Sequence, residues 1–255
     1  MDEINRIYEV DGDHPLQIIN IDTLYCNIDN IQDLLIKKGI YKHKLAALHL
    51  NIHSLPAKFD QLIRIIEHLH SKKITLHIIM LCETFLRDNI SHMFNIPGYS
   101  LLCKNRKSIS RGGVALYIKD SLQFKIRDDI TINVENEFES IFIEIINDSK
   151  HTNTLVGEIY RVPNTNEQIS LERFQTIISR IGQTNTTSII GTDQNFDLLK
   201  LDNHKTTLEL FNSFVTAGHL PTILRPTRIT HSSCTLIDNI YTNCLNDSST
   251  YFSGI

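Results

Sequence analysis

The chain has 255 residues and a formal net charge of −4, which is enough for one large domain or two small ones and excludes a protein with a strongly basic overall surface. Hydrophobic residues make up 41% and charged residues 21%, a balance that excludes a disordered chain. The five cysteines form no C-x-x-C pair and their number is odd, so we expect neither a disulfide framework nor a zinc knuckle.

The sequence predicts no membrane segment. The longest apolar stretch, residues 74–86, is interrupted by His77 and Glu83 and is too short to cross a bilayer. Asp2 and Glu3 are acidic where a signal peptide would be basic. We therefore expect an intracellular protein, in the nucleus or the cytoplasm, without a membrane partner.

The first 43 residues differ from the rest of the chain. They are acidic at the start and contain one clear helical stretch, residues 28–38, so we interpret residues 1–43 as an N-terminal flanking arm. A regular pattern of apolar runs begins at residue 44, and we assign residues 44–255 to one domain.

Within this domain, short apolar runs alternate with amphipathic stretches. Runs of strand length predict strands at residues 45–50, 75–81, 114–118, 140–146, 154–159, 186–190 and 235–241. Apolar residues at helical spacing predict helices at residues 58–69, 169–181 and 206–217. Strands outnumber helices, and the helices fall between groups of strands. The pattern therefore favours an α/β (α+β) fold, a two-sheet sandwich flanked by helices, over a doubly wound sheet.

Polar residues that end or interrupt these strands carry the chemical signal. They are Asn51, Glu83, Tyr160, Asp193, Asn195 and Asp238. Each alone is most often a turn residue or a core aromatic, but a carboxylate within the apolar run at residues 236–240 needs a partner when buried. Acidic residues at the ends of separate strands can converge on one rim of a sheet. Carboxylate and amide oxygens there suit a hard cation such as Mg²⁺.

The set and its order resemble the endonuclease/exonuclease/phosphatase superfamily. The motifs are Leu-Asn-Ile-His-Ser-Leu, Leu-Cys-Glu-Thr-Phe-Leu, Ile-Tyr-Arg-Val-Pro-Asn, Gly-Thr-Asp-Gln-Asn-Phe-Asp and Leu-Ile-Asp-Asn-Ile. Three further stretches, residues 96–99, 111–117 and 225–230, resemble the apurinic-like endonuclease domain of LINE-type, jockey-like non-LTR retrotransposons. The resemblance covers residues 45 to 243.

This resemblance implies a hydrolase that cuts phosphodiester bonds with a divalent metal, Mg²⁺ or Mn²⁺. It implies an endonuclease that nicks target DNA for retrotransposition and leaves a 3′-hydroxyl that primes reverse transcription. Glu83 would then be the main metal ligand, supported by Asn51. Asp193 would orient and deprotonate the attacking water or share in metal binding.

The same resemblance implies roles for the remaining rim residues. Asn195 would hydrogen-bond the phosphoryl oxygens as they gain charge, Tyr160 would lie near the leaving group, and Asp238 would support the rim. In-line attack at phosphorus builds negative charge on the equatorial oxygens, which a cation and fixed donors stabilise.

A basic loop at residues 104–111 contains four basic residues and no acid. An isolated run of this kind is usually a solvated loop, but next to the rim it would hold DNA phosphates. We expect Lys104, Arg106 and Lys107 to bind DNA, with Arg161 as a further candidate. DNA is the expected partner of a monomeric protein.

Two departures from the family pattern leave alternatives open. Gly-Thr-Asp-Gln-Asn stands where the family usually reads Gly-Asp-Phe-Asn, and the sequence has no Ser-Asp-His triplet of the kind with which family members finish. We therefore expect the domain to lack its last strand, as in a C-terminally truncated element. The alternatives are a catalytically impaired DNA-binding remnant, or another metal-dependent phosphoesterase of the same superfamily that acts on an inositol phosphate or a nucleotide.

Overall fold

The computed structural model describes residues 15–19, 21, 23–37, 45–108, 111–147, 152–244 and 251–253. The predicted boundary between the arm and the domain, at residues 43 and 44, lies outside these ranges, as do the last two residues of the chain.

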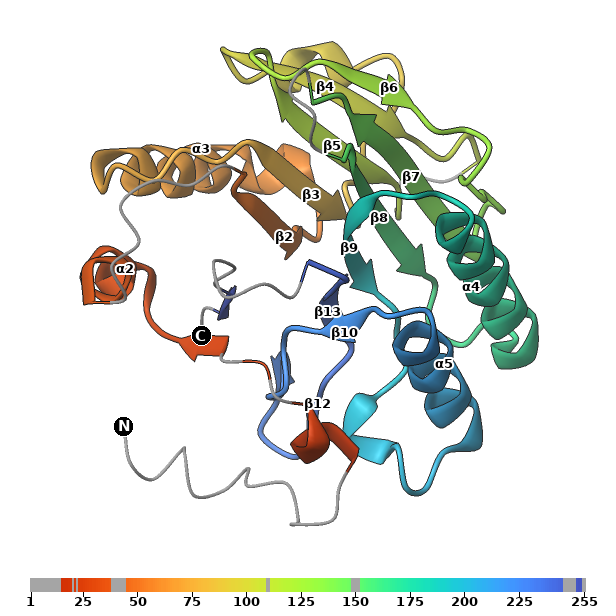
Figure 1. Ribbon diagram of the computed structural model, residues 1–255. Coiled ribbons are helices and arrows are strands. Elements are labelled where there is room, and N and C mark those ends of the chain that lie inside the picture. The colour runs from red at the N-terminus through yellow and green to blue at the C-terminus, as the bar shows by residue number, and fades with distance from the viewer. Residues whose placement is uncertain are drawn as a thin grey trace.

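Two β-sheets pack face to face in the middle of the molecule (Figure 1). In the described part of the chain the smaller sheet has four strands, ordered β2 (Ala47–Asn51), β3 (Ile78–Cys82), β5 (Val114–Lys119) and β4 (Tyr99–Lys104). The larger has six, ordered β10 (Leu220–Pro221), β13 (Asp238–Thr242), β9 (Thr187–Asp193), β8 (Thr154–Arg161), β7 (Phe138–Ile145) and β6 (Phe124–Ile126).

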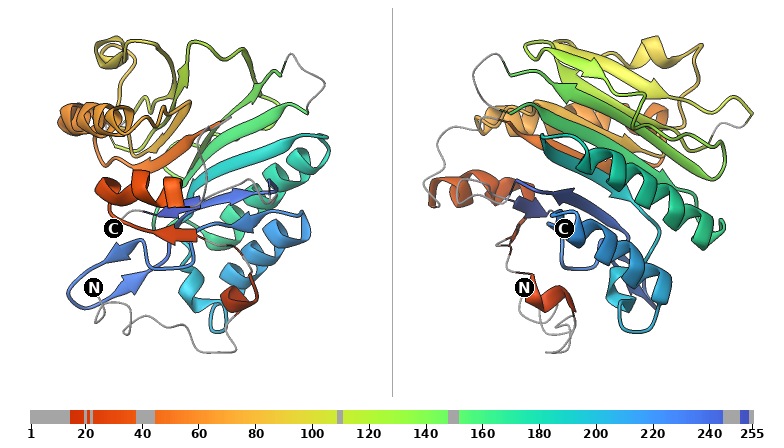
Figure 2. Two further views of the ribbon diagram at one scale, coloured as in Figure 1. Left: turned by 60° about the vertical axis from the view of Figure 1, so that its left-hand side comes forward. Right: turned by 45° about the vertical axis from the view of Figure 1, so that its right-hand side comes forward.

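Helices cover the outer face of each sheet (Figure 2). Helix α3 (Leu55–Ser71) lies on the four-stranded sheet and buries Leu55, Leu62 and Leu69 there. Helices α4 (Glu167–Gly182) and α5 (Lys205–Thr216) lie on the six-stranded sheet. This arrangement confirms the predicted α/β sandwich of two sheets flanked by helices.

The core between the two sheets is formed by alternate residues of facing strands. Its fully enclosed members are Ile78, Met80, Cys82, Val114, Leu116, Ile118, Ile141, Ile143, Ile145, Val156 and Tyr160. Because helices enclose the other faces, every residue of β3 and of β7 is buried. Strand β3 reads as the continuous apolar run expected of a strand that is buried on both faces. The alternation at residues 140–146 instead predicts a half-buried strand, and the structure buries it fully, with Glu139, Ser140 and Glu144 among its buried residues.

Shorter elements complete the described chain. They are η1 (Pro15–Ile18), β1 (Thr23–Tyr25), η2 (Ile28–Asn30), α2 (Ile31–Lys37), η3 (Ser91–Phe94), η4 (Leu198–Lys200), β11 (Arg228–Ile229), β12 (Cys234–Thr235) and β14 (Tyr251–Ser253). Strand β1 pairs in parallel with β14, and β11 with β12 form a small hairpin. Among the described helices, none is both long and apolar enough to cross a membrane.

Described parts of the N-terminal segment pack on the domain. Leu16 is buried in a cluster with Leu198 and Phe211. The Tyr25 hydroxyl accepts a hydrogen bond of 2.8 Å from the Leu224 backbone N–H. These contacts show that Leu16 and Tyr25 are part of the packed structure.

Candidate active site

The strand register brings the predicted polar residues to one rim of the sandwich. Strands β2 and β3 are parallel, so Asn51 at the end of one lies beside Glu83, which follows the end of the other. Strands β8 and β9 are also parallel, with Tyr160 beside Asp193. Strand β13 runs antiparallel to β9 and places Asp238 opposite Asp193.

The Asn51 side chain connects the two sheets at this rim. Its Nδ2 donates to Glu83 Oε1 at 2.9 Å and to Asp193 Oδ2 at 2.8 Å. The other Asp193 oxygen accepts from Asn195 Nδ2 at 2.8 Å, and the same Asn195 amide donates to the Arg161 carbonyl at 2.7 Å. Both amide hydrogens of each asparagine are therefore used, and the two carboxylates have fixed positions relative to one another.

The backbone at the rim adopts an unusual conformation. His53, Glu83 and Asn195 have φ of 43°, 50° and 48°, in the left-handed region that residues other than glycine seldom occupy. Ties between the loops hold this conformation, since the Ser54 N–H donates to the Glu83 carbonyl at 2.8 Å and the Thr84 N–H to that of Gly113 at 3.2 Å. Such strain costs roughly 1–3 kcal/mol per residue and clusters at functional sites.

Burial and neighbouring charge set the protonation of the rim. Asp193 is 1% exposed, and burial together with the negative charges of Asp238 and Glu83 raises its pKa well above the usual range. Burial also raises the pKa of Asp238, whose Oδ2 accepts a hydrogen bond of 2.8 Å from the Thr227 hydroxyl. Burial and the charges of Glu83 and Asp193 raise the pKa of Tyr160, so its hydroxyl stays protonated and can donate.

Comparison with known proteins identifies the fold. Neither a protein-family model nor a curated protein sequence matches the chain. The endonuclease domain of TRAS1, a telomere-specific non-LTR retrotransposon, matches with a TM-score of 0.56 at 12% identity, over 78% of this chain and 85% of that one. An endonuclease/exonuclease/phosphatase family protein from Bacteroides thetaiotaomicron matches with a TM-score of 0.53 at 15% identity, over 78% and 80%. A mannosyl-6-phosphatase from the same organism matches with a TM-score of 0.54 at 13% identity, over 79% and 86%.

The chain has the endonuclease/exonuclease/phosphatase fold. The structure brings Asn51, Glu83, Asp193 and Asn195 into direct contact. Tyr160 lies beside Asp193 in the strand register.

One layer below the rim of this endonuclease/exonuclease/phosphatase fold, a charged pair joins the two sheets. His49 Nδ1 lies 3.0 Å from Glu158 Oε2, and both side chains are buried. They stand two residues before Asn51 and Tyr160 and face the same side. Burial alone would lower the pKa of His49, but the Glu158 carboxylate raises it to about 9. The sequence carries the signal for this pair, since both are polar residues inside otherwise apolar strands.

His53 is a second feature that sequence reasoning misses. Its Nδ1 lies 2.9 Å from Glu83 Oε2, and the ring packs edge-on against Phe85 with centroids 5.2 Å apart. Its backbone N–H donates to Asn51 Oδ1 at 3.1 Å, which orients the Asn51 amide. The signal in the sequence is its place two residues after the strand-end asparagine.

Two of the residues predicted to bind DNA, Arg106 and Arg161, lie inside the protein instead of on its surface. Arg106 is buried, donates through Nε to Glu139 and lies 6.0 Å from the centre of the Tyr160 ring. Arg161 is buried, and its Nη1 and Nη2 donate to the Asn195 and Thr165 carbonyls at 2.9 Å each. Most donors of both guanidinium groups are thus engaged within the protein, whereas Arg106 Nη2 and Arg161 Nε are buried without a hydrogen-bond partner among the described residues. DNA contact by either residue stays a prediction.

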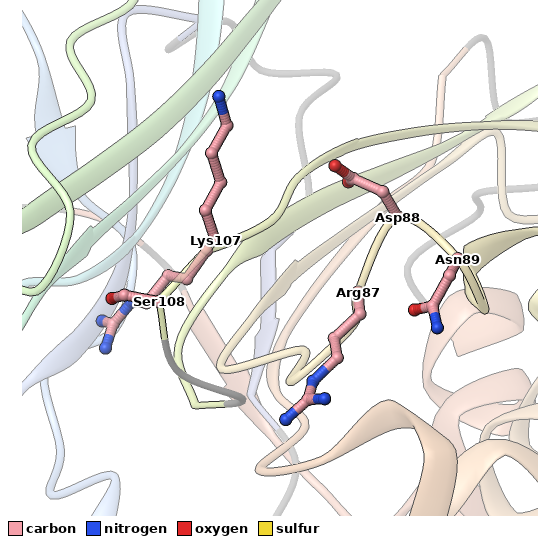
Figure 3. A pocket seen from close by; sticks show the side chains of 6 residues that line it. Arg87, Asp88, Asn89, Lys107 and Ser108 are labelled. Carbon is pink, nitrogen blue, oxygen red and sulfur yellow. The ribbon is translucent and has the colours of Figure 1, made fainter.

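The basic loop lines a surface pocket of about 380 Å³ together with the loop that follows Glu83. Figure 3 shows this pocket with Arg87 and Lys107, which come from the two different loops. Both are exposed, and neither has an ion-pair partner within the described residues. Among the residues that line this pocket, Arg87 and Lys107 are the exposed cations that a phosphate could contact.

Proposed function

We propose that the protein is a divalent-metal-dependent phosphodiesterase, and that it acts as a DNA endonuclease that nicks target DNA for a non-LTR retrotransposon. The observation that carries the proposal is the Asn51 amide between Glu83 and Asp193, which fixes two carboxylates at the meeting point of two sheets. Tyr160 stands at the same rim with a protonated hydroxyl, and Asn195 holds the second oxygen of Asp193.

The residues at the rim fit a hard divalent cation. Mg²⁺ is usually held by one or two carboxylates, waters and substrate phosphates. Among the described residues no group of three or more His, Cys, Asp and Glu side chains is assembled as a metal site, so the protein would supply few ligands. Glu83, 17% exposed at its side chain, would hold the ion with support from Asn51. When bound, the metal neutralises charge on the phosphate and favours ionisation of water.

The other side chains have roles that follow from their contacts. Asp193, held through both oxygens, would orient the attacking water and accept its proton, and its raised pKa brings it closer to the working pH of a general base. Asn195 would keep Asp193 in place, and it would stabilise phosphoryl oxygens by exchanging its hydrogen bond to the Arg161 carbonyl. The protonated hydroxyl of Tyr160 would donate a hydrogen bond near the leaving oxygen. Asp238, which lies opposite Asp193 and accepts a hydrogen bond from Thr227, would support the rim.

DNA as the substrate has separate support. The retrotransposon endonuclease TRAS1 shares the fold over most of both chains. The exposed cations Arg87 and Lys107 line a pocket formed in part by the loop that follows Glu83, where they would bind backbone phosphates. A nick would leave the 3′-hydroxyl that a reverse transcriptase extends.

A second candidate is a phosphoesterase that acts on a small phosphorylated molecule. The likeness to the mannosyl-6-phosphatase favours it, since that enzyme shares the fold to the same degree. The rim chemistry is common to both candidates, so the substrate distinguishes them. A DNA-binding remnant without hydrolysis is the remaining alternative.

Nicking of supercoiled plasmid with Mg²⁺ tests the proposal. We expect the chain to convert supercoiled plasmid to open circles, and we expect EDTA to abolish the reaction. Asp193→Ala should reduce the rate by about 10²–10⁴ because it removes the general base. Asp60→Ala, which changes an exposed aspartate on α3, is the matched control and should nick normally. DNA binding without nicking in the unmodified chain would support the remnant, and hydrolysis of small phosphate esters alone would support the second candidate.

A further inference from the structure

His53 occupies a position that the proposed roles of the rim residues leave unexplained. Its side chain is 68% exposed, yet its Nδ1 lies 2.9 Å from Glu83 Oε2. Glu83 is the carboxylate that the proposed function assigns to the metal, and the inference below rests on that assignment. An exposed imidazole therefore lies directly against the carboxylate that is proposed to bind the metal.

The separation of the two atoms is that of a hydrogen bond, and it also suits two groups that bind one ion. Two ligands bound at right angles, each at about 2.1 Å, lie about 3 Å apart. His53 Nδ1 and Glu83 Oε2 are 2.9 Å apart. A cation that bound both would replace their direct hydrogen bond with little movement of either side chain.

The surrounding structure holds the imidazole in this orientation. The His53 backbone is in the left-handed region, with φ of 43°, which directs the side chain back toward Glu83. The ring packs edge-on against Phe85, and the backbone N–H is bound to Asn51 Oδ1 at 3.1 Å. His53 is thus tied to Asn51 and Glu83, the two residues proposed for the metal.

We propose that His53 is a ligand of the metal site at Glu83 and that its imidazole gives the site a preference for first-row transition ions such as Mn²⁺ over Mg²⁺. Carboxylate and amide oxygens suit Mg²⁺, whereas imidazole nitrogen binds transition ions better.

Electron paramagnetic resonance of Mn²⁺ bound to the full chain tests the inference without any activity assay. We expect the bound Mn²⁺ to show coupling to one directly bonded nitrogen. His53→Asn suits the left-handed backbone and replaces the nitrogen ligand with an oxygen. It should remove the coupling and weaken Mn²⁺ binding by about tenfold, with little change in the concentration of Mg²⁺ that saturates the site. His70→Asn, at an exposed histidine of α3, should change neither quantity.

The outcomes separate this inference from the proposed function. Mn²⁺ binding that depends on Glu83, measured with Glu83→Gln, but shows no nitrogen coupling would contradict the His53 ligand and leave the proposed function intact. Nitrogen coupling that persists in His53→Asn would contradict it as well. An unmodified chain that binds no Mn²⁺, or one whose Mn²⁺ binding is unaffected by Glu83→Gln, would contradict both.

Discussion

Lys107 and Lys104 lie three residues apart on the same loop, but their electrostatic surroundings differ. Lys104 Nζ is 3.3 Å from Asp128 Oδ1. Lys107 is exposed, and its backbone N–H donates to Glu135 Oε1 at 2.8 Å, so the loop is anchored while the ammonium group stays in solvent. A phosphate would have to compete with Asp128 for Lys104, whereas Lys107 has no ion-pair partner in the part of the chain that the structure describes.

We expect Lys107→Ala to weaken DNA binding more than Lys104→Ala. Each phosphate contact that is lost should lower the salt dependence of binding by about 0.9 in the slope of log K against log salt. Fluorescence anisotropy with a labelled duplex at several salt concentrations measures both quantities. Equal slopes for Lys107→Ala and the unmodified chain would show that Lys107 does not contact a phosphate.

Tyr160 permits a test of one proposed donor at the rim. Because burial and the charges of Glu83 and Asp193 keep its hydroxyl protonated, Tyr160→Phe removes a hydrogen-bond donor and no charge. We expect kcat for nicking to fall by about 10²-fold, with KM little changed, in single-turnover and steady-state assays. A higher KM with an unchanged kcat would instead show that Tyr160 contributes to substrate binding and not specifically to the transition state.

Strand β9 illustrates how one element supports both the site and the layer below it. Asp193 ends the strand at the rim, and Gly191 lies two residues earlier on the same face, opposite Glu158 in the register. A Cβ at Gly191 would lie 2.3 Å from Glu158 Oε2 and 2.8 Å from His49 Nδ1. Glycine at this position therefore makes room for the pair that joins the sheets.

Gly191→Ala should lower the free energy of unfolding by about 1–3 kcal/mol, because the added methyl group would displace the buried Glu158 and His49 side chains. Urea denaturation followed by circular dichroism measures the change. Gly182→Ala is the matched control, since a Cβ there meets no atom within 4 Å. If both variants were equally stable, close packing at Gly191 would not be the cause of the glycine requirement.

At the opposite end of the same strand, a buried histidine should make the stability of the protein depend on pH. His219 Nε2 lies 2.5 Å from the Ser188 hydroxyl, and burial lowers the His219 pKa. As the pH falls, the unfolded chain therefore takes up the proton before the folded protein does. The contribution of neutral His219 to stability is complete above its unfolded pKa of about 6.5 and is lost as the pH falls below it.

Urea denaturation of His219→Gln and the unmodified chain at pH 7.5 and pH 5.5 checks this sign. Taking the difference between the two proteins cancels the contribution of other titrating groups. The stability advantage of the unmodified chain should be smaller at pH 5.5 than at pH 7.5. An advantage that grows on acidification would mean that the folded protein holds His219 protonated.

At the scale of the whole molecule, the N-terminal segment contributes to the core. Leu16 is 2% exposed and packs with Leu198, Leu201, Phe211 and Leu236. The sequence predicts a flanking arm here because the segment is acidic at its start and contains one clear helical stretch. Its contact with the domain instead depends on single apolar side chains that enter a cluster formed by distant residues.

Leu16→Ala should therefore lower the free energy of unfolding by about 2–5 kcal/mol. Ile36→Ala, at a side chain 52% exposed, should change it by no more than about 0.5 kcal/mol. Thermal and urea unfolding of the two variants measure the difference. Similar values for both would show that the segment adds no stability to the fold.

Buried strands and helices are predicted from the sequence more accurately than half-buried ones at the edge of a sheet. Strands β3, β5 and β7 and helices α3, α4 and α5 are predicted within a few residues, because a continuous apolar run, an alternation or a helical period is visible between residues that are close in sequence. Strand β4 is missed, since it lies at a sheet edge with mostly half-buried residues. Its sequence has no clear alternation.

The sequence by itself determined the sandwich of two sheets and the strand-end positions of Asn51, Glu83, Tyr160 and Asp193, because both depend on local periodicity and on where apolar runs stop. The tertiary structure alone decided which groups meet. Asn51 donates to Asp193 across 142 residues of sequence, and Arg106 and Arg161 turn inward to Glu139 and to backbone carbonyls. Such contacts depend on how the two sheets pack, and no pattern of neighbouring residues encodes that.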